Sequence, residues 1–388
     1  MVEKAYPKIH ERVVEETLAS GLAIRVMPKP GFTKAYAQLS VNYGSIDAQF
    51  DAGDGMIIPP KGVAHFLEHK VFEQPDGGNA LAIFAATGAS PNAYTSKTMT
   101  AYHFSCTDRF DRNLEILLDF VTTPHFTDEN VAKEQGIIGQ EIGMVGDKPH
   151  FKVYENLMSA LYQVHPAKDS IIGTVESIAN IDRHVLSDCY HTFYIPSNMV
   201  LTVAGDVDPA RVIHAAESML SKRYIAPPAR DYGLEPQAPA RAEVMEQMEC
   251  SLPIFAIGFK SAGETSGERG MKLRLCAMLA CELLFGESSP FYADAYREGL
   301  INQEFGAEPM FFPGSTALMI SGESRDPDEV VRRILAVSRD FDDAYFMRVK
   351  RSLYGMRMRR FDHFGALCRE VAGAVFAGYH YFDTFEAF

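Results

Sequence analysis

The five residues from His65 to His69 read His-Phe-Leu-Glu-His and place two imidazoles and a carboxylate on one face of a helix. At roughly 100° per residue, His65 and His69 lie about 40° apart around the helix axis, with Glu68 beside them. Two neutral imidazoles at this spacing can bind one zinc ion, and the carboxylate can reach a water in an open coordination position. The order H-x-x-E-H is the inverse of the H-E-x-x-H zinc motif.

The alternative to a metal site is a pair of packed or solvated histidines at an accidental spacing. Phe66, Leu67 and Phe72 surround the triplet with apolar side chains and predict a largely buried helix. Buried imidazole and carboxylate groups need partners, and a metal ion supplies one. The pattern therefore favours a metal site over a structural pair.

An acidic segment downstream, from Glu134 to Glu141, offers a third ligand. Its two terminal glutamates are seven residues apart, which is about two turns along nearly the same helical face. Acid pairs at this spacing are common on solvated helices, so the pair alone predicts little. Coupled to His65, Glu68 and His69, it becomes a specific indication of a metal site.

Hydrophobic periodicity predicts the elements that position these groups. The first half has predicted strands at 35–43, 99–107 and 200–205 and predicted helices at 111–123, 128–144 and 208–222. Between 226 and 241, four prolines stand among few hydrophobic residues, which is typical of a linker.

The second half repeats this order weakly. It has predicted strands at 254–259 and within 302–322 and predicted helices at 268–285, 289–299 and 327–338. The comparable helix carries Cys281-Glu-Leu-Leu and no H-x-x-E-H motif, so we expect no second zinc site. The predicted domains are 1–225, with the zinc motif, and 246–388, without it, joined by a linker at 226–245.

The order of motifs along nearly the whole chain resembles the inverted-motif zinc peptidases of the pitrilysin class. The similar segments are Leu18 to Leu22 with Gly44-Ser45 after it, His65 to His69, Gly88 to Thr95, Glu134 to Glu141, Gly173 to Ile178 and Tyr194 to Met199. The likeness is strongest to a bacterial cytoplasmic, two-domain branch. It implies an α+β fold of two similar α/β-sandwich domains, each a mostly antiparallel sheet with helices packed on one face.

The resemblance also implies a role for each candidate residue. One zinc ion per chain would be bound by His65, His69 and Glu141, with Glu68 as the general base. Glu134 would orient a ligating histidine. An edge strand would hold an extended peptide substrate by strand addition, through Asn92, Ala93 and Thr95. An ordinary turn-to-strand junction is the alternative interpretation of those three residues.

One segment departs from the family pattern. Many active members carry an Arg and a Tyr, in a stretch resembling R-x-x-x-G-L-x-Y, that contact the substrate carbonyl. Here Ala295 and Asn302 stand at those positions, while Tyr296 and Arg297 leave the register open. Because losing such donors costs catalysis, we expect a partner subunit to supply them. The chain is expected to form a homodimer, or a heterodimer with a zinc-less homologous subunit that supplies the Arg and Tyr. The end at Phe388 also predicts a shortened second domain.

Composition is typical of a soluble cytoplasmic enzyme. The net charge of −14 argues against nucleic-acid binding, and the basic segment 348–360 is interpreted as a solvated amphipathic helix. No signal peptide is evident, and no stretch approaches the roughly 20 apolar residues of a membrane span. The six scattered cysteines are expected to be reduced, and many of them buried.

Two functions follow from these observations. The first is a zinc endopeptidase that acts on short or unfolded peptides or on a precursor. The second is a metal-binding but non-catalytic scaffold subunit of a peptidase-like complex. The presence of Glu68 favours the enzyme, because a structural metal site needs ligands but no base.

Overall fold

The computed structural model describes residues 1–53, 55–75, 77–220 and 223–388, which form two compact units, each discontinuous in sequence. The first unit comprises Met1–Ile142, Ser170–Asp231 and Arg360–Phe376, and the second comprises Gly143–Asp169, Tyr232–Arg359 and Ala377–Phe388. The boundaries predicted at 225 and 246 follow the two halves of the sequence. The compact units differ from those halves. The segment 143–169 of the first half belongs to the second unit, and the segment 360–376 of the second half belongs to the first unit.

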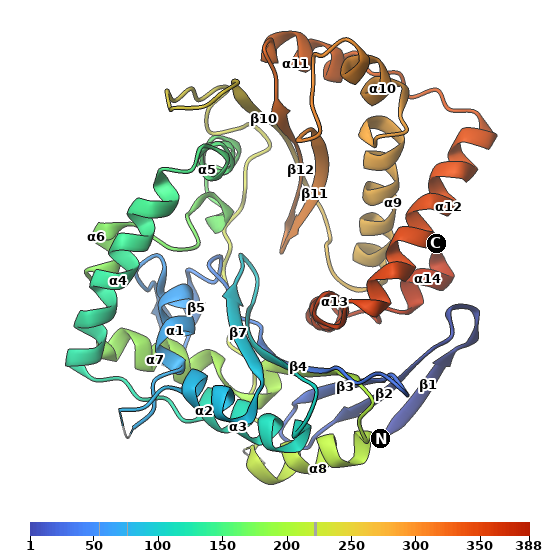
Figure 1. Ribbon diagram of the computed structural model, residues 1–388. Helices are drawn as coiled ribbons and strands as arrows, with labels where there is room; N and C mark the ends of the chain where they lie inside the picture. The colour runs from blue at the N-terminus through green and yellow to red at the C-terminus, as the bar shows by residue number, and fades with distance from the viewer. Residues whose placement is uncertain (54, 76, 221–222) are drawn as a thin grey trace. The chain divides into compact units, whose positions relative to one another are not determined.

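A seven-stranded sheet forms the framework of the first unit, in the order β1-β2-β3-β9-β4-β8-β7 (Figure 1). Neighbouring strands are antiparallel except β3 and β9, which are parallel. The strands are β1 (Val2–Tyr6), β2 (Glu11–Thr17), β3 (Ala23–Pro28), β4 (Ala35–Val41), β7 (Ser90–Thr95), β8 (Thr100–Cys106) and β9 (Met199–Gly205), and a separate ribbon pairs β5 (Phe50–Asp51) with β6 (Met56–Ile57).

Helices cover this sheet on both faces. The helices of the first unit are α1 (Val63–Val71), α2 (Ala80–Thr87), α3 (Phe110–Thr122), α6 (Val175–Ile178), α7 (Arg183–Phe193), α8 (Pro209–Met219) and α13 (Phe364–Phe376), while α4 (Asp128–Gly146) runs on into the second unit. Leu39 and Val41 of β4 join the core shared with α1 and α3. Tyr36 points to the opposite face and contacts Gly365 of α13. A helix from the end of the chain therefore covers the face that the N-terminal helices leave open. This sheet carries helices on both faces, whereas the resemblance implied helices on one face only.

The second unit has a three-stranded antiparallel sheet in the order β10-β12-β11. Its elements are β10 (Ile254–Ala262), β11 (Gly306–Phe312), β12 (Ser315–Glu323), α5 (Pro149–Leu161), α9 (Gly267–Phe285), α10 (Pro290–Arg297), α11 (Pro327–Leu335), α12 (Asp343–Arg359) and α14 (Asp383–Ala387). Phe255 and Ile320 pack with Phe285 on one face. On the other, a Cβ at Gly258 would lie 2.8 Å from Leu157 of α5, so α5 packs closely there.

The predicted elements are confirmed in type and order. Each strand and helix predicted from periodicity overlaps an observed one, and the region 302–322 forms the hairpin β11–β12. The predicted helix 208–222 ends at Met219, and its residues 221–222 lie outside the described residues. The segment 348–360 lies largely in α12. Short 3-10 turns occupy Pro7–Ile9, Pro166–Lys168, Pro196–Asn198 and Arg360–Asp362.

Two further expectations concern the linker and the cysteines. From 223 to 253 the structure has no helix or strand beyond a bridge at Arg230, as expected of a Pro-rich linker. All six cysteines are free thiols, and Cys106, Cys189, Cys281 and Cys368 are buried. None of the described helices is both long and apolar enough to cross a membrane.

Candidate metal centre

Helix α1 begins at a tight turn that requires glycine. Gly62 has φ of 91°, and a Cβ there would lie 2.7 Å from the carbonyl oxygen of Ile172, so a larger residue is excluded by both strain and space. From this turn α1 packs against β7 and β8 and buries Phe66 and Leu67 completely (Figure 1). The apolar side of α1 thus fixes the orientation of its histidines.

Three candidate ligands converge from two helices. One ring nitrogen of His65, one of His69 and a carboxylate oxygen of Glu141 lie within 4.8 Å of one another. Oε2 of Glu141, on α4, is 3.8 Å from Nε2 of each histidine. Ligand atoms around a tetrahedral zinc lie about 3.3 Å apart, so small side-chain movements would let these groups bind one ion. Among the described residues, no other trio of His, Cys, Asp or Glu side chains is grouped in this way.

His65 is held in the neutral form that binds metals. Its side chain is buried. Burial, and then the neighbouring His69, lower the pKa of His65 to about 3. At neutral pH its imidazole therefore carries a free lone pair, and no proton has to leave before a metal binds.

Glu134 and Lys70 lie behind His69. Oε1 of Glu134 is 2.9 Å from Nδ1 of His69, and Oε2 is 3.6 Å from Nζ of Lys70. Lys70 is fully buried, lies 2.5 Å from Glu73 and donates to the carbonyl of Asn130 at 3.1 Å. Burial opposes the charge of Glu134, but His69 and Lys70 outweigh it and lower the pKa of Glu134. The charged carboxylate can therefore accept the Nδ1 proton of His69, which would leave Nε2 free to bind a metal.

The pKa of His69 shifts in the opposite direction to that of His65. Burial alone would lower its pKa, but the hydrogen bond to Glu134 and the charges of Glu68 and Glu141 raise the pKa of His69 above its ordinary value. Protons therefore compete with a metal for this histidine more strongly than for His65.

Glu68, the candidate base, is held by the edge strand. Its Oε2 accepts a hydrogen bond from Oγ1 of Thr95 at 2.6 Å. Burial raises the pKa of Glu68, and the bond from Thr95 offsets part of that rise. A carboxylate with a raised pKa is a stronger base, which suits proton transfer near neutral pH.

The three candidate substrate-binding residues lie on β7, the last strand of its sheet. Thr95 and Ala93 point toward α1, where Thr95 contacts Glu68 and Ala93 packs on the core. Asn92 is exposed, and its Oδ1 accepts a hydrogen bond from the amide of Ala93 at 2.9 Å. Of the three, Thr95 is the residue that touches the candidate base.

The segment expected to lack the Arg and Tyr donors lies in the second unit. Ala295 is 1% exposed within α10, so a longer side chain there would have to displace its neighbours. Nδ2 of Asn302 donates to Oε2 of Glu323 at 2.8 Å. The neighbouring Arg297 is paired with Asp294.

Sequence reasoning missed the roles of Lys70 and Thr95. Lys70 stands one helical turn after Phe66, on the buried face of α1. A buried cation needs carboxylate partners, and this position was the signal that could have indicated them. The contact of Thr95 with Glu68 joins residues 27 apart, and no local pattern indicates it.

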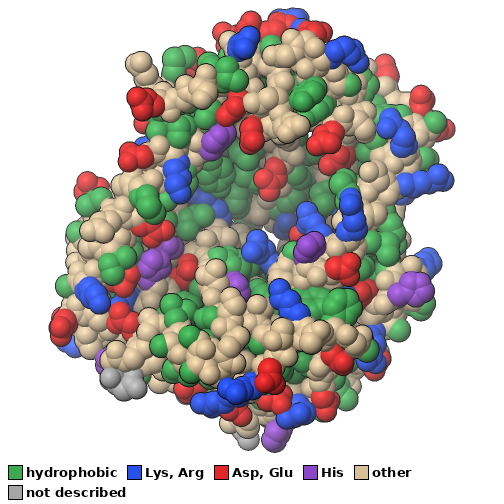
Figure 2. Space-filling model, viewed as in Figure 1, with side chains coloured by type: hydrophobic (Ala, Val, Ile, Leu, Met, Phe, Trp, Pro, Cys, Tyr) green, Lys and Arg blue, Asp and Glu red, His purple; other side chains and the backbone are tan. Residues whose placement is uncertain are grey.

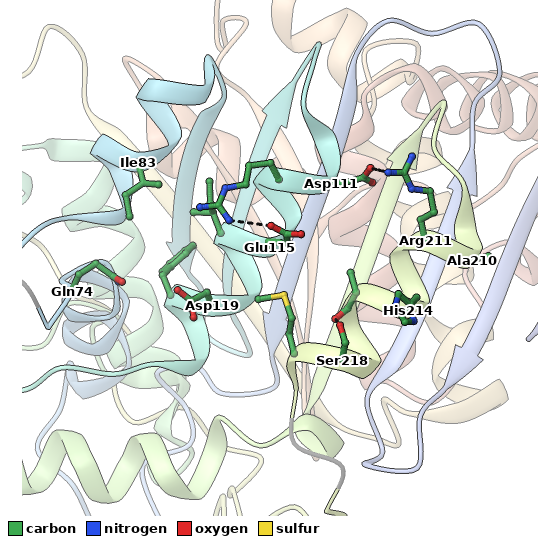
Figure 3. Close-up of a pocket in the computed structure, with 14 residues that line it drawn as sticks. Gln74, Ile83, Asp111, Glu115, Asp119, Ala210, Arg211, His214 and Ser218 are labelled. Carbon is green, nitrogen blue, oxygen red and sulfur yellow. Dashed lines mark hydrogen bonds and ion pairs between the residues drawn. The ribbon is translucent and has the colours of Figure 1, made fainter.

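A separate groove of about 820 Å³ opens between α3 and α8 (Figure 3). Asp111 there pairs with Arg211 of α8, and Arg112 pairs with Glu115. Asp119 and His214 also line it. None of the candidate site residues lines this groove.

Charges of both signs are interspersed over the face of the molecule in Figure 2.

The motif and the converging candidate ligands are typical of a metal-dependent hydrolase, and the chain matches two models of one such family. Residues 29–175 match Insulinase (Peptidase family M16), and residues 180–351 match Peptidase M16 inactive domain. An uncharacterized zinc protease of Bacillus subtilis, YmfH, is 40% identical over 335 residues, which are 85% of this chain and 78% of YmfH. The chain belongs to peptidase family M16.

Other relatives agree with this assignment. A solved M16-like peptidase from Alicyclobacillus acidocaldarius has a TM-score of 0.93 and 35% identity, covering 99% of this chain and 93% of that one. A protease from Helicobacter pylori shares the fold, with a TM-score of 0.78 at 18% identity over 95% and 90% of the two chains. A mitochondrial-processing peptidase subunit beta of Arabidopsis thaliana is 26% identical over 59% of this chain and 45% of its own length. The predicted resemblance and the two-domain α+β fold are thereby confirmed.

Proposed function

We propose that this chain is a zinc-dependent endopeptidase that cleaves peptides or unfolded or precursor polypeptides. The convergence of His65, His69 and Glu141 beside the half-buried Glu68 carries this proposal. The names of its relatives as zinc proteases support it. Two imidazole nitrogens and one carboxylate oxygen are a donor set that zinc accepts in catalytic sites.

The chain's own residues would divide the chemistry among them. Bound zinc would lower the pKa of a water and polarise the peptide carbonyl. Glu68 would take the proton of the attacking water and then pass it to the departing amine. Thr95 would hold the Glu68 carboxylate in place, and Glu134 would hold His69.

The edge of β7 would hold the substrate. An extended peptide can add a strand there by main-chain hydrogen bonds, next to Asn92, Ala93 and Thr95. Because Thr95 also contacts Glu68, a peptide on β7 would run directly past the base.

We further propose that the working enzyme is a dimer enclosing a chamber, with a partner supplying the Arg and Tyr donors. The burial of Ala295 and the bond of Asn302 to Glu323 support this, because neither position can offer a donor of that kind. A relative named as a subunit of a processing peptidase is consistent with such pairing. The dimer would be contradicted if the protein is a monomer in analytical ultracentrifugation and the same sample has full peptidase activity. The cytoplasmic location stays a prediction from sequence.

The experiment that tests the function is Glu68→Gln, with zinc content and peptide cleavage measured on the same samples. We expect zinc to stay bound and cleavage to fall by about 10²- to 10⁴-fold, the usual contribution of a general base. Glu282→Gln, on the comparable helix α9, is the matched control and should change neither quantity.

Two results would contradict the proposal. One is cleavage that persists in the Glu68→Gln variant with zinc still bound. The other is an unsubstituted protein that binds zinc but, assayed with its partner, cleaves no member of a diverse peptide library.

A further inference from the structure

A cation lies beside the edge strand, on the face of the sheet opposite to Glu68. The guanidinium of Arg369, on α13, lies 4.4 Å from the ring centroid of Tyr94 in β7. Tyr94 directly precedes Thr95, which contacts Glu68. Because successive residues of a strand point to opposite faces, the side chain of Tyr94 points away from the candidate base. Tyr94 and Arg369 therefore lie on the opposite face of the sheet, next to the strand position that contacts Glu68.

The charge of Arg369 is not balanced locally. Arg369 is exposed, and among the described residues no carboxylate pairs with it. The adjacent Glu370 is paired with Arg360 at 2.8 Å. His103, packed near Tyr94, adds no charge at neutral pH, because burial and then Arg369 lower the pKa of His103 to about 4.

The contact with the Tyr94 ring also restricts the guanidinium. A planar guanidinium that lies on an aromatic ring loses rotational freedom and keeps its N–H groups directed outward in the plane. Such a group is prepared to bind a carboxylate by two hydrogen bonds, which a lysine at the same place would not do.

A peptide on β7 would bring side chains to this group. Residues opposite each other in paired strands point to the same face. The peptide residue opposite Thr95 would face Glu68, and the residue opposite Tyr94 would face Arg369. The subsite beside Arg369 therefore lies within about two residues of the cleaved bond.

We propose that Arg369 forms a subsite for a carboxylate of the bound peptide and so gives the enzyme a preference for an acidic residue close to the cleaved bond. This inference rests on the proposed function, because it requires a peptide on β7. It assigns α13 a role in substrate selection in addition to covering the sheet.

The test measures peptide binding without cleavage, in the full chain carrying Glu68→Gln. Fluorescent peptides with both ends blocked would carry Glu, Gln or Lys at one position at a time. We expect one position at which Glu binds at least about 10-fold more tightly than Gln, as hydrogen bonds to a charged group predict. Adding Arg369→Glu should abolish that preference and transfer it to Lys at the same position.

Two further variants complete the test. Arg369→Gln should remove the preference without creating a new one, and it replaces the charge reversal if that variant does not fold. Arg112→Glu, an exposed arginine of α3 with the same change of charge, should leave the preference intact. A neutral peptide with a free C-terminus distinguishes a terminal carboxylate from a side chain as the group recognised.

The proposal is overturned if Glu and Gln peptides bind equally at every position, if Arg369→Glu and Arg369→Gln leave a preference unchanged, or if no peptide binds. Its failure is distinct from failure of the proposed function. Cleavage by the unsubstituted protein without acidic preference would reject the subsite alone. A zinc-loaded protein that cleaves nothing would reject the peptidase.

Discussion

Both units bury a glutamate against a lysine, but different groups hold the two carboxylates. In the second unit, Glu235 pairs with Lys260 and accepts hydrogen bonds from the backbone amides of Gln163, Val164 and His165 at 2.7–2.9 Å. In the first unit, Glu134 accepts from His69 and lies near Lys70.

We interpret this as the difference between a structural carboxylate and a candidate functional one. Every partner of Glu235 is a donor within the second unit. The Glu235 carboxylate therefore links the 163–165 loop to Lys260 of β10 and has a structural role. Glu134 instead acts on an imidazole whose other nitrogen faces Glu141. A buried ion pair is thus no sign of a site by itself. A functional site is indicated when the contacts of a buried carboxylate lead to an atom that can still bind a ligand.

The first prediction tests how far each glutamate depends on its lysine. Lys70→Met leaves Glu73 and Glu134 facing a buried apolar group, so we expect it to lower the free energy of unfolding by about 3–5 kcal/mol. Lys260→Met should cost less, because Glu235 keeps its three amide donors. Urea unfolding of the metal-free chain measures both. An equal or larger loss for Lys260→Met would refute the distinction.

The second prediction ranks the carboxylates by their effect on the metal. Glu134→Gln should weaken zinc binding by about 10- to 100-fold, as for other groups that support a ligand. Glu141→Gln removes a proposed ligand and should weaken it further, by more than about 100-fold. Competition with a chelator gives the dissociation constants. Unchanged zinc affinity in Glu141→Gln would remove this residue from the ligand set.

The same contrast explains what could be predicted from the sequence. His65, Glu68 and His69 lie within one helical segment, so spacing alone placed them on a common face. Glu141 needed the resemblance to a known family, because its distance from His65 depends on how α4 packs. Contacts such as that of Thr95 with Glu68 arise only when strands pair, and no local pattern encodes them.

The packing of α5 and α13 was also beyond sequence reasoning, because each helix lies in the unit built mainly from the other half of the sequence. Periodicity predicted no helix at α5 or α13, and a local pattern does not indicate which sheet a helix covers. α13 packs against β4 and β9, and α5 packs against β10, each on a sheet formed mainly by the other half of the sequence. Docking of this kind depends on complementary surfaces, such as Gly258 against Leu157, that no single segment reveals.

The last prediction uses pH to separate the structural carboxylate from the site. Burial opposes the charge of Glu235, but the amides and Lys260 lower its pKa from 4.5 to about 2. A carboxyl group with a lowered pKa in the folded state stabilises the fold above its unfolded pKa, and this contribution is lost as pH falls from 4.5 toward about 2. Glu235→Gln should therefore lower the free energy of unfolding by about 2 kcal/mol near neutral pH, with the difference from the unsubstituted chain shrinking as the solution is acidified through that window. Chemical unfolding at several pH values measures the difference, and zinc affinity at neutral pH should not change. A difference that is independent of pH would show that Glu235 contributes through packing and not through its charge, and the contrast with Glu134 would then rest on the metal alone.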